Sequence, residues 1–140
     1  MKYKNPIPTV DALIEKNGKI LLIRRKIEPF KGKLALPGGH IEYGETVENA
    51  IKREVKEETN LKIKLIDILG VYSDPKRDPR GHRISIVFIA KPIGKKLNAG
   101  SDALDIGFYN PEKLKKEDLA FDHFKIIKDY LKYKKYKKAY

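Results

Sequence analysis

Three glutamates stand close together in the stretch REVKEETNL, residues 53–61. Glu54, Glu57 and Glu58 are three and four residues apart, so a helix would place them on one face; we call them the acid stripe. At about 100° per residue, the acid stripe continues the face that is apolar in the first two turns of that helix. Burying one unpaired carboxylate costs several kcal/mol, so three would need protons or cations among them. Clusters of hard oxygen ligands select Mg²⁺ or Mn²⁺.

The helix face opposite the acid stripe carries Asn49, Lys52 and Lys56. The alternative interpretation is therefore an ordinary solvated Glu/Lys helix, in which Arg53 neutralises part of the charge at the i+4 position. The preceding segment, LPGGHIEYGE, favours a ligand site, because a Gly-Gly bend lets the backbone approach a ligand closely. Exposed carbonyls at such a bend can also ligate a metal, although a Gly-Gly pair by itself is usually just a turn.

Together these residues resemble the Nudix box, which here would span 23 residues. The matching positions are Gly39, Glu45, Arg53, Glu54, Val55, Glu57, Glu58 and Leu61. Asn60 stands where the box has Gly, and Asn is the next-best residue for the left-handed conformation that ends a helix. The hairpin before the box, the strand after it and the segment LAFDHFKII also look like this family, so the resemblance covers most of the chain.

The resemblance implies an α/β fold, a Nudix-type α/β/α sandwich with a mixed central sheet. It also implies metal-dependent hydrolysis of a nucleoside diphosphate that is linked to another group. Mg²⁺ or Mn²⁺ would be held by Glu54, Glu57 and Glu58, with help from the Gly38 carbonyl. Arg53 would orient these glutamates from outside the metal's own ligand set.

The general base is left open by the same resemblance. A glutamate of the box, such as Glu58, is one candidate. In this family the base often comes from a later loop, and here the loop NAGSDALD offers Asp102 and Asp105. Asp102 is equally suited to an N-cap or a turn, and Glu45 resembles a structural partner of the box.

Basic residues gather in YSDPKRDPRGHRIS, residues 72–85, between two expected strands. Arg77, Arg80 and His82 belong to this loop, and Arg forms bidentate hydrogen bonds to phosphates. Ordinary surface charge in a turn shaped by Pro and Gly is the alternative. The segment looks like that of the short prokaryotic ADP-ribose pyrophosphatases, which commonly carry a Pro at about this distance beyond the box. Here Pro75 follows the box by 14 residues.

We therefore expect substrate contacts from Gly39, Arg25, Arg77, Arg80 and His82, and hydrolysis of ADP-ribose to AMP and ribose 5-phosphate. One alternative is a house-cleaning (deoxy)nucleoside triphosphate pyrophosphatase, whose substrates would include oxidised guanine nucleotides. Another is a nucleotide-sensing module without turnover, or a processor of RNA 5′ ends. The complete glutamate set argues against an inactive site.

The elements that must position these residues can be read along the chain. Asn17-Gly18 between two apolar runs is a strong hairpin signal, and residues 26–44 form a long loop with short extended pieces. The expected strands are 9–16, 19–25, 62–72, 83–91 and 105–109, and the expected helices are 46–59 and 122–135. Thr46 is a suitable N-cap for the first helix. Strands flanked by two helices favour a mixed sheet in an α/β sandwich.

The chain has 140 residues, which suits one domain spanning residues 1–140. It has no Cys, so disulfides and Cys-ligated metals are excluded. No segment resembles a signal peptide or a membrane span, and the default expectation is a cytoplasmic protein. Relatives that cleave ADP-ribose are often homodimers sharing the substrate pocket, and the sequence does not settle the oligomeric state.

The net charge of +12 is unevenly distributed along the chain. Residues 125–140 hold seven Lys and one Asp, and so contribute +6. Tyr interleaved with Lys is compatible with nucleic acid. A solvated helical end, whose positive charge suits the helix dipole, is the preferred interpretation.

Overall fold

The computed structural model of the protein describes residues 4–94 and 105–138. Its centre is a seven-stranded sheet whose main strand order is β3-β2-β1-β6-β5. The strands are β1 (Ile7–Lys16), β2 (Lys19–Arg24), β3 (Leu34–Ala35), β4 (Gly38–His40), β5 (Lys62–Tyr72), β6 (Arg83–Ile93) and β7 (Ile106–Tyr109). The two short strands β3 and β4 are the extended pieces that the sequence predicted within the loop of residues 26–44.

The sheet is mixed, as predicted. β1 runs parallel to β6, whereas the pairs β1–β2, β1–β4, β5–β6 and β2–β7 are antiparallel. The β1–β2 hairpin turns at Asn17 and Gly18, whose φ angles of 53° and 77° are both positive. This is the backbone geometry that makes an Asn-Gly pair a hairpin signal.

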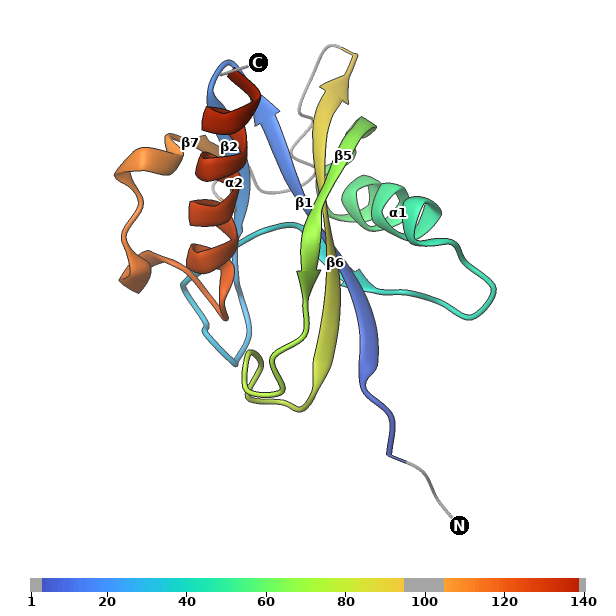
Figure 1. Ribbon diagram of the computed structural model, residues 1–140. Coiled ribbons are helices and arrows are strands. Elements are labelled where there is room, and N and C mark those ends of the chain that lie inside the picture. Colours follow the sequence, from blue (N-terminus) through green and yellow to red (C-terminus); the bar gives the residue numbers. More distant parts are fainter. Residues whose placement is uncertain (1–3, 95–104, 139–140) are drawn as a thin grey trace.

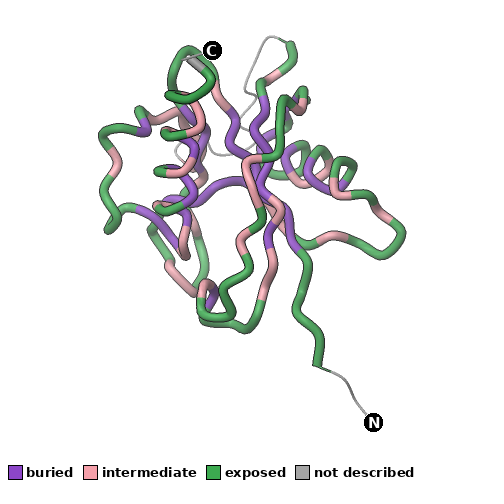
Figure 2. Tube along the Cα trace, in the orientation of Figure 1, coloured by how far each residue is buried: buried purple, intermediate pink, exposed green. Residues whose placement is uncertain are grey.

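In the described part of the chain, two α-helices cover opposite faces of the sheet (Figure 1). These are α1 (Val47–Thr59) and α2 (His123–Lys138), and two short 3-10 helices, Pro111–Lys113 and Lys116–Asp118, precede α2. One apolar cluster joins α1 to the sheet and a second joins α2 to it. Figure 2 shows the buried positions concentrated where the sheet meets the helices. The layered α/β fold that the sequence predicted is therefore confirmed.

Both ends of α1 are capped as the sequence indicated. The Thr46 hydroxyl accepts a hydrogen bond from the Asn49 amide at 3.1 Å. Asn60 ends the helix in the left-handed conformation, with φ of 61°. The departure from the box at this position is thus accommodated by the backbone, and the caps fix which residues of α1 face the sheet.

Among the described residues, no helix is both long and apolar enough to cross a membrane.

Candidate active site

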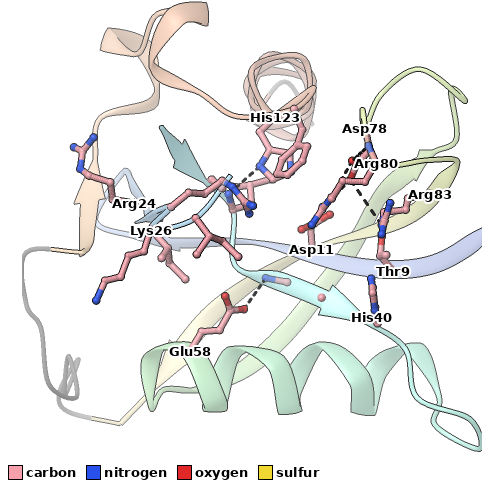
Figure 3. Close-up of a pocket in the computed structure, with 18 of the residues that line it drawn as sticks. Thr9, Asp11, Arg24, Lys26, His40, Glu58, Asp78, Arg80, Arg83 and His123 are labelled. Atoms are coloured by element: carbon pink, nitrogen blue, oxygen red, sulfur yellow. Dashed lines mark hydrogen bonds and ion pairs between the residues drawn. The ribbon is translucent and has the colours of Figure 1, made fainter. Parts of the chain in front are cut away.

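A cavity of about 540 Å³ opens beside α1. Its walls come from β1, the end of β2, β4, the last turn of α1, the β5–β6 loop and the start of α2. Figure 3 shows the arrangement, with Glu58 rising from α1 toward β4 and arginines from the β5–β6 region across the cavity. Acidic and basic side chains from distant parts of the sequence therefore meet around one space.

The acid stripe lies on the side of α1 that the helix phase predicted. Ala50, Ile51 and Val55 are buried, whereas Lys52 and Lys56 are exposed. Among the three glutamates, Glu57 and Glu58 line the cavity, and the Glu54 side chain is largely buried beside β4. The carboxylates are thus presented at the rim between the helix and the sheet.

Two glycines of β4 make this close packing possible. The Gly38 amide donates a hydrogen bond to Glu58 Oε1 at 2.9 Å. A Cβ atom added at Gly38 would lie 2.1 Å from the Val10 carbonyl oxygen, and one added at Gly39 would lie 2.4 Å from the Glu54 carboxyl carbon. Any larger residue would displace the strand or the carboxylate. The Gly-Gly pair therefore lets β4 pack closely against β1 and the Glu54 carboxylate, and does not merely form a turn.

Arg53 connects several parts of the box. Its guanidinium donates to both carboxyl oxygens of Glu45, at 2.6 and 3.0 Å, and to Glu54 at 2.9 Å. It also donates to the His40 carbonyl at 3.0 Å, and more weakly to Glu57 at 3.4 Å. The hydrogen bonds to Glu45 are the largest cause of a raised pKa for Arg53, and they lower the pKa of Glu45. Arg53 therefore stays charged and offsets part of the acid stripe.

A further carboxyl group lies on the cavity floor, and sequence reasoning missed it. Asp11 of β1 is buried, and its Oδ2 accepts a hydrogen bond from the Ser85 hydroxyl at 2.5 Å. Burial raises the pKa of Asp11 to about 7, and nearby carboxylates, including Glu54, add to the effect. The available signal was an Asp within the apolar run that forms β1.

Burial also raises the pKa of Glu58 to about 8, and repulsion from Glu54, Asp11 and Glu57 adds to it. Glu58 is an exposed residue, but its carboxyl end enters the crowded rim beside Gly38. Burial, together with the nearby negative charge, thus disfavours ionisation of Glu58. A bound cation would remove that penalty.

The donor chemistry of this rim suits a hard divalent cation, because every candidate side-chain ligand is a carboxylate oxygen. In the part of the chain that the structure describes, however, no three acidic or His side chains converge into a ready-made site. The reason is visible in the hydrogen bonds: Arg53 holds Glu54 and contacts Glu57, while Glu58 turns to the Gly38 amide. Ion binding would therefore require these side chains to exchange such contacts for the metal.

The arginines that the sequence predicted as substrate contacts have different surroundings. Arg77 lines the cavity, but its guanidinium forms a bidentate pair with Asp122 at 2.7 and 2.8 Å, and its side chain is 5% exposed. It ties the β5–β6 loop to the start of α2. Arg80 and Arg25 also line the cavity, and Arg80 is paired with Asp78 at 2.7 and 3.0 Å.

His82 does not join this group. It is exposed and is absent from the cavity lining, and its Nε2 lies 3.0 Å from the Ser73 carbonyl oxygen. This contact closes the base of the β5–β6 loop, so the structure gives His82 a local role within the loop. Asp102 lies outside the described residues. Asp105 lines the cavity and pairs with Lys26 at 2.6 Å.

Two residues at and just before the start of α2, His123 and Phe121, were not singled out from the sequence. His123 is buried against the cavity, and its Nδ1 accepts a hydrogen bond from the Leu36 amide at 3.0 Å. Burial lowers the pKa of His123 to about 4. Phe121 lines the cavity in a left-handed conformation, with φ of 53°. The segment LAFDHFKII was noted only for its likeness to the family, because the contacts of these two side chains with the β2–β3 loop and the cavity form only in the folded chain.

Comparison of the chain with known proteins identifies its relatives. Residues 5–130 match the NUDIX domain. An ADP-ribose pyrophosphatase from Methanocaldococcus jannaschii is 59% identical over 132 residues, which are 94% of this chain and 77% of that protein. A MutT-like protein from Streptomyces ambofaciens is 31% identical over 77% of this chain and 66% of its own length.

Solved structures similar to this chain also include Nudix proteins. The NUDIX domain of Shewanella oneidensis NrtR, complexed with ADP ribose, is 26% identical with a TM-score of 0.75, over 93% of this chain and 89% of that one. A bifunctional NMN adenylyltransferase/ADP ribose pyrophosphatase from Francisella tularensis, complexed with AMP and a manganese ion, is 33% identical with a TM-score of 0.76. That match covers 94% of this chain and 43% of that one. Nudix ADP-ribose pyrophosphatases generally need a divalent metal. With its box folded as predicted at the rim of the cavity, the chain belongs to the Nudix hydrolase family.

Proposed function

We propose that the chain hydrolyses the diphosphate of ADP-ribose to AMP and ribose 5-phosphate with the help of Mg²⁺ or Mn²⁺. The observation that carries this proposal is the cavity itself, which has the acid stripe on one side and arginines on the other. Both a metal-binding rim and a basic wall suit a diphosphate, which carries two or more negative charges. The 59% identity to a protein named ADP-ribose pyrophosphatase supports the choice of substrate.

Glu54, Glu57 and Glu58 would hold the metal, together with the Gly38 carbonyl. A bound divalent ion neutralises charge that develops on phosphate oxygens and lowers the pKa of a bound water. Either Mg²⁺ or Mn²⁺ fits a set of carboxylate and carbonyl oxygens.

The chain's own residues supply positioning and charge, which are the main contributions in phosphoryl chemistry. Arg53 keeps the Glu54 carboxylate in place against β4 while it stays bonded to Glu45. Glu58 faces the cavity and is our candidate for accepting a proton from the attacking water. Asp102 stays a second candidate from the sequence.

The experiment is an assay of the purified chain on a nucleotide panel, with Mg²⁺ and with Mn²⁺, in which products are identified by chromatography. Hydrolysis of ADP-ribose to AMP and ribose 5-phosphate, at a higher kcat/KM than for any nucleoside triphosphate, supports the proposal. A preference for a nucleoside triphosphate with release of inorganic pyrophosphate would refute it. That result would favour the house-cleaning alternative.

ADP-ribose binding without turnover is a second candidate, favoured by the likeness to the NrtR domain that was solved with ADP ribose. Tight binding of ADP-ribose with no product formed at any metal concentration would support this sensing role. A cytoplasmic location, a single domain and the absence of a nucleic-acid partner stay predictions from the sequence, which leaves open whether the chain forms a homodimer.

A further inference from the structure

The imidazole ring of His123 lies between the end of β3 and the cavity. His123 begins α2 and lines the cavity, yet only 4% of the residue is exposed. Figure 3 shows it across the cavity from Glu58. A polar side chain in the wall of a ligand cavity is a candidate contact for the ligand, because a few such groups fix how a ligand is oriented.

The contact with Leu36 determines which ring nitrogen of His123 carries the proton. A backbone amide can only donate, so the Nδ1 atom that lies 3.0 Å from the Leu36 nitrogen must present a lone pair. A neutral imidazole then carries its single proton on the other nitrogen, which makes Nε2 an N–H donor. Burial lowers the pKa of His123 to about 4, so the ring is uncharged at neutral pH.

The Nε2–H donor has no hydrogen-bond acceptor among the described residues. It is also not one of the fully buried unpaired side-chain atoms in that part of the chain, which belong to Arg25, Arg83 and Asp105. The small exposed fraction of His123 therefore includes Nε2. Since the residue lines the cavity, this donor is accessible to a ligand there.

The His123 ring is held in a fixed orientation. The Ala120 amide donates to the Leu34 carbonyl at 2.8 Å, and the His123 amide donates to the Ala120 carbonyl at 3.1 Å, so the start of α2 is tied to β3. The centre of the Phe121 ring lies 5.3 Å from that of His123, at an interplanar angle of 48°. Together with the Leu36 hydrogen bond, these contacts fix the direction of Nε2–H before a ligand arrives, which reduces the entropy lost on binding.

A neutral donor suits an uncharged acceptor. The cavity already presents several arginines, which match ionised phosphate oxygens through charge-assisted hydrogen bonds. A neutral N–H forms a weaker bond, but a site built around it discriminates against ligands that lack the acceptor, because the donor is then left unpaired. In a nucleotide, the uncharged acceptors are the hydroxyl oxygens of a ribose and the ring nitrogens of a base.

We infer that the Nε2–H group of His123 is a specificity contact, which donates a hydrogen bond to an uncharged ribose oxygen or base nitrogen of the bound nucleotide. This inference rests on the proposed function for the class of substrate. Because His123 lies across the cavity from the acid stripe, the contact holds a part of the nucleotide away from the reacting phosphate. It therefore stabilises the bound substrate and the transition state equally, and contributes to KM rather than to kcat.

Two substitutions separate the donor from the hydrogen bond to Leu36. His123→Asn keeps an acceptor near the Nδ1 position but has no group at the Nε2 position. His123→Gln places an amide N–H near the Nε2 position and gives up the contact with Leu36, so it is the matched control.

The affinity of each variant for ADP-ribose is measured by calorimetry in EDTA, where metal-dependent hydrolysis does not occur. His123→Asn should weaken binding by about 3-fold to 10-fold, the usual effect of losing a neutral hydrogen bond. His123→Gln should bind ADP-ribose more tightly than His123→Asn does. In the hydrolysis assay with metal, His123→Asn should raise KM by a similar factor with little change in kcat.

The two products of the proposed reaction show which half of the nucleotide carries the acceptor. A loss of affinity confined to AMP would place the acceptor on the adenosine half. A loss confined to ribose 5-phosphate would place it on the other ribose. Either result supports the inference, whereas no loss for AMP, ribose 5-phosphate or ADP-ribose would overturn it.

Nitrogen NMR of the wild type, with ¹⁵N-labelled histidine, gives a measurement that does not depend on the folding of a variant. The signal of His123 is identified by its contact with the Leu36 amide. Its Nε2 should carry a directly bonded proton in the free protein, and the Nε2 signal should shift when ADP-ribose is added. A proton on Nδ1, or an Nε2 signal unchanged at saturating ADP-ribose, would overturn the inference.

The order of the two variants decides between a ligand contact and a purely structural role. A structural role predicts that His123→Gln, which loses the Leu36 hydrogen bond, binds more weakly than His123→Asn, and that order would overturn the inference. Affinity of His123→Asn within 2-fold of the wild type would also overturn it. If the nucleotide panel identifies a different substrate, the proposed function fails alone, and the same variants are then compared on that nucleotide.

Discussion

His123 should make the fold sensitive to acid in a defined window. Its Nδ1 accepts the Leu36 amide hydrogen at 3.0 Å, so that nitrogen must be unprotonated in the folded chain. Protonation would replace this hydrogen bond with a repulsive contact between two donors, and would place a charge in a buried position. Burial accordingly lowers the pKa of His123 from its ordinary 6.5 to about 4.

The sign of the effect follows from proton uptake. Between about pH 4 and 6.5, the unfolded chain binds a proton at His123 that the folded chain does not. The free energy of unfolding should therefore fall as the pH drops through this window, and should not change through this group above about pH 7. The full difference is about 3 kcal/mol, and about 2.5 kcal/mol of it should be lost by pH 4.5.

The assay compares urea unfolding of the wild type and His123→Asn at pH 7.5 and pH 4.5, without metal. The Asn side-chain oxygen can accept the same amide hydrogen but does not titrate, and the cavity left by the smaller side chain destabilises the variant equally at both pH values. Titration of other groups, such as Asp11, is common to both proteins and cancels. The wild type should lose about 2.5 kcal/mol more than the variant on acidification. Equal losses would refute the assignment of a buried, neutral His123.

Three further substitutions, with Lys56→Gln as a control, test the site and its support. Glu57→Gln should lower kcat by orders of magnitude with an unchanged Tm, whereas Lys56→Gln on the opposite face of α1 should do little, as hydrolysis kinetics and thermal melts will show. Gly39→Ala should also lower kcat, because the added methyl would lie 2.4 Å from a carboxyl carbon of the acid stripe. Arg77→Gln leaves Asp122 without its bidentate partner and should lower the free energy of unfolding in urea by about 3 kcal/mol.

Each of these expectations has a contrary outcome. An equal loss of activity in Lys56→Gln would mean that the acid stripe does not define the site. Full activity of Gly39→Ala would mean that the close packing of β4 on α1 is not needed. A stability loss under about 0.5 kcal/mol for Arg77→Gln, the level of a surface substitution, would show that its ion pair does not anchor the loop.

Local patterns predicted the elements that carry the box. The Asn-Gly turn, the Thr46 cap and the left-handed Asn60 each act over a few residues, so their signals survive in the sequence alone. The helix phase that separated Lys56 from the acid stripe is likewise a local property. The structure confirmed these features, because α1 begins and ends at the predicted caps and buries the predicted face against the sheet.

Contacts between distant segments around the cavity could not be predicted from such local patterns. Loop sequence alone gave Arg77, Arg80 and His82 the same role, whereas the fold pairs Arg77 with Asp122, some 45 residues later, and turns His82 toward the loop's own backbone. Asp11 and Phe121 acquire their environments only when β1 and the start of α2 meet the cavity. Contacts between distant segments determine the charge and accessibility of these residues.

The most direct test of the central claim is to locate the metal. A crystal structure of the chain with Mn²⁺ and a non-hydrolysable ADP-ribose analogue, with the ion found by its anomalous scattering, should place the ion between Glu54, Glu57, Glu58 and the diphosphate. Ion and diphosphate bound elsewhere, or the three carboxylates left without metal at saturating Mn²⁺, would contradict the assignment of this rim as the hydrolytic site.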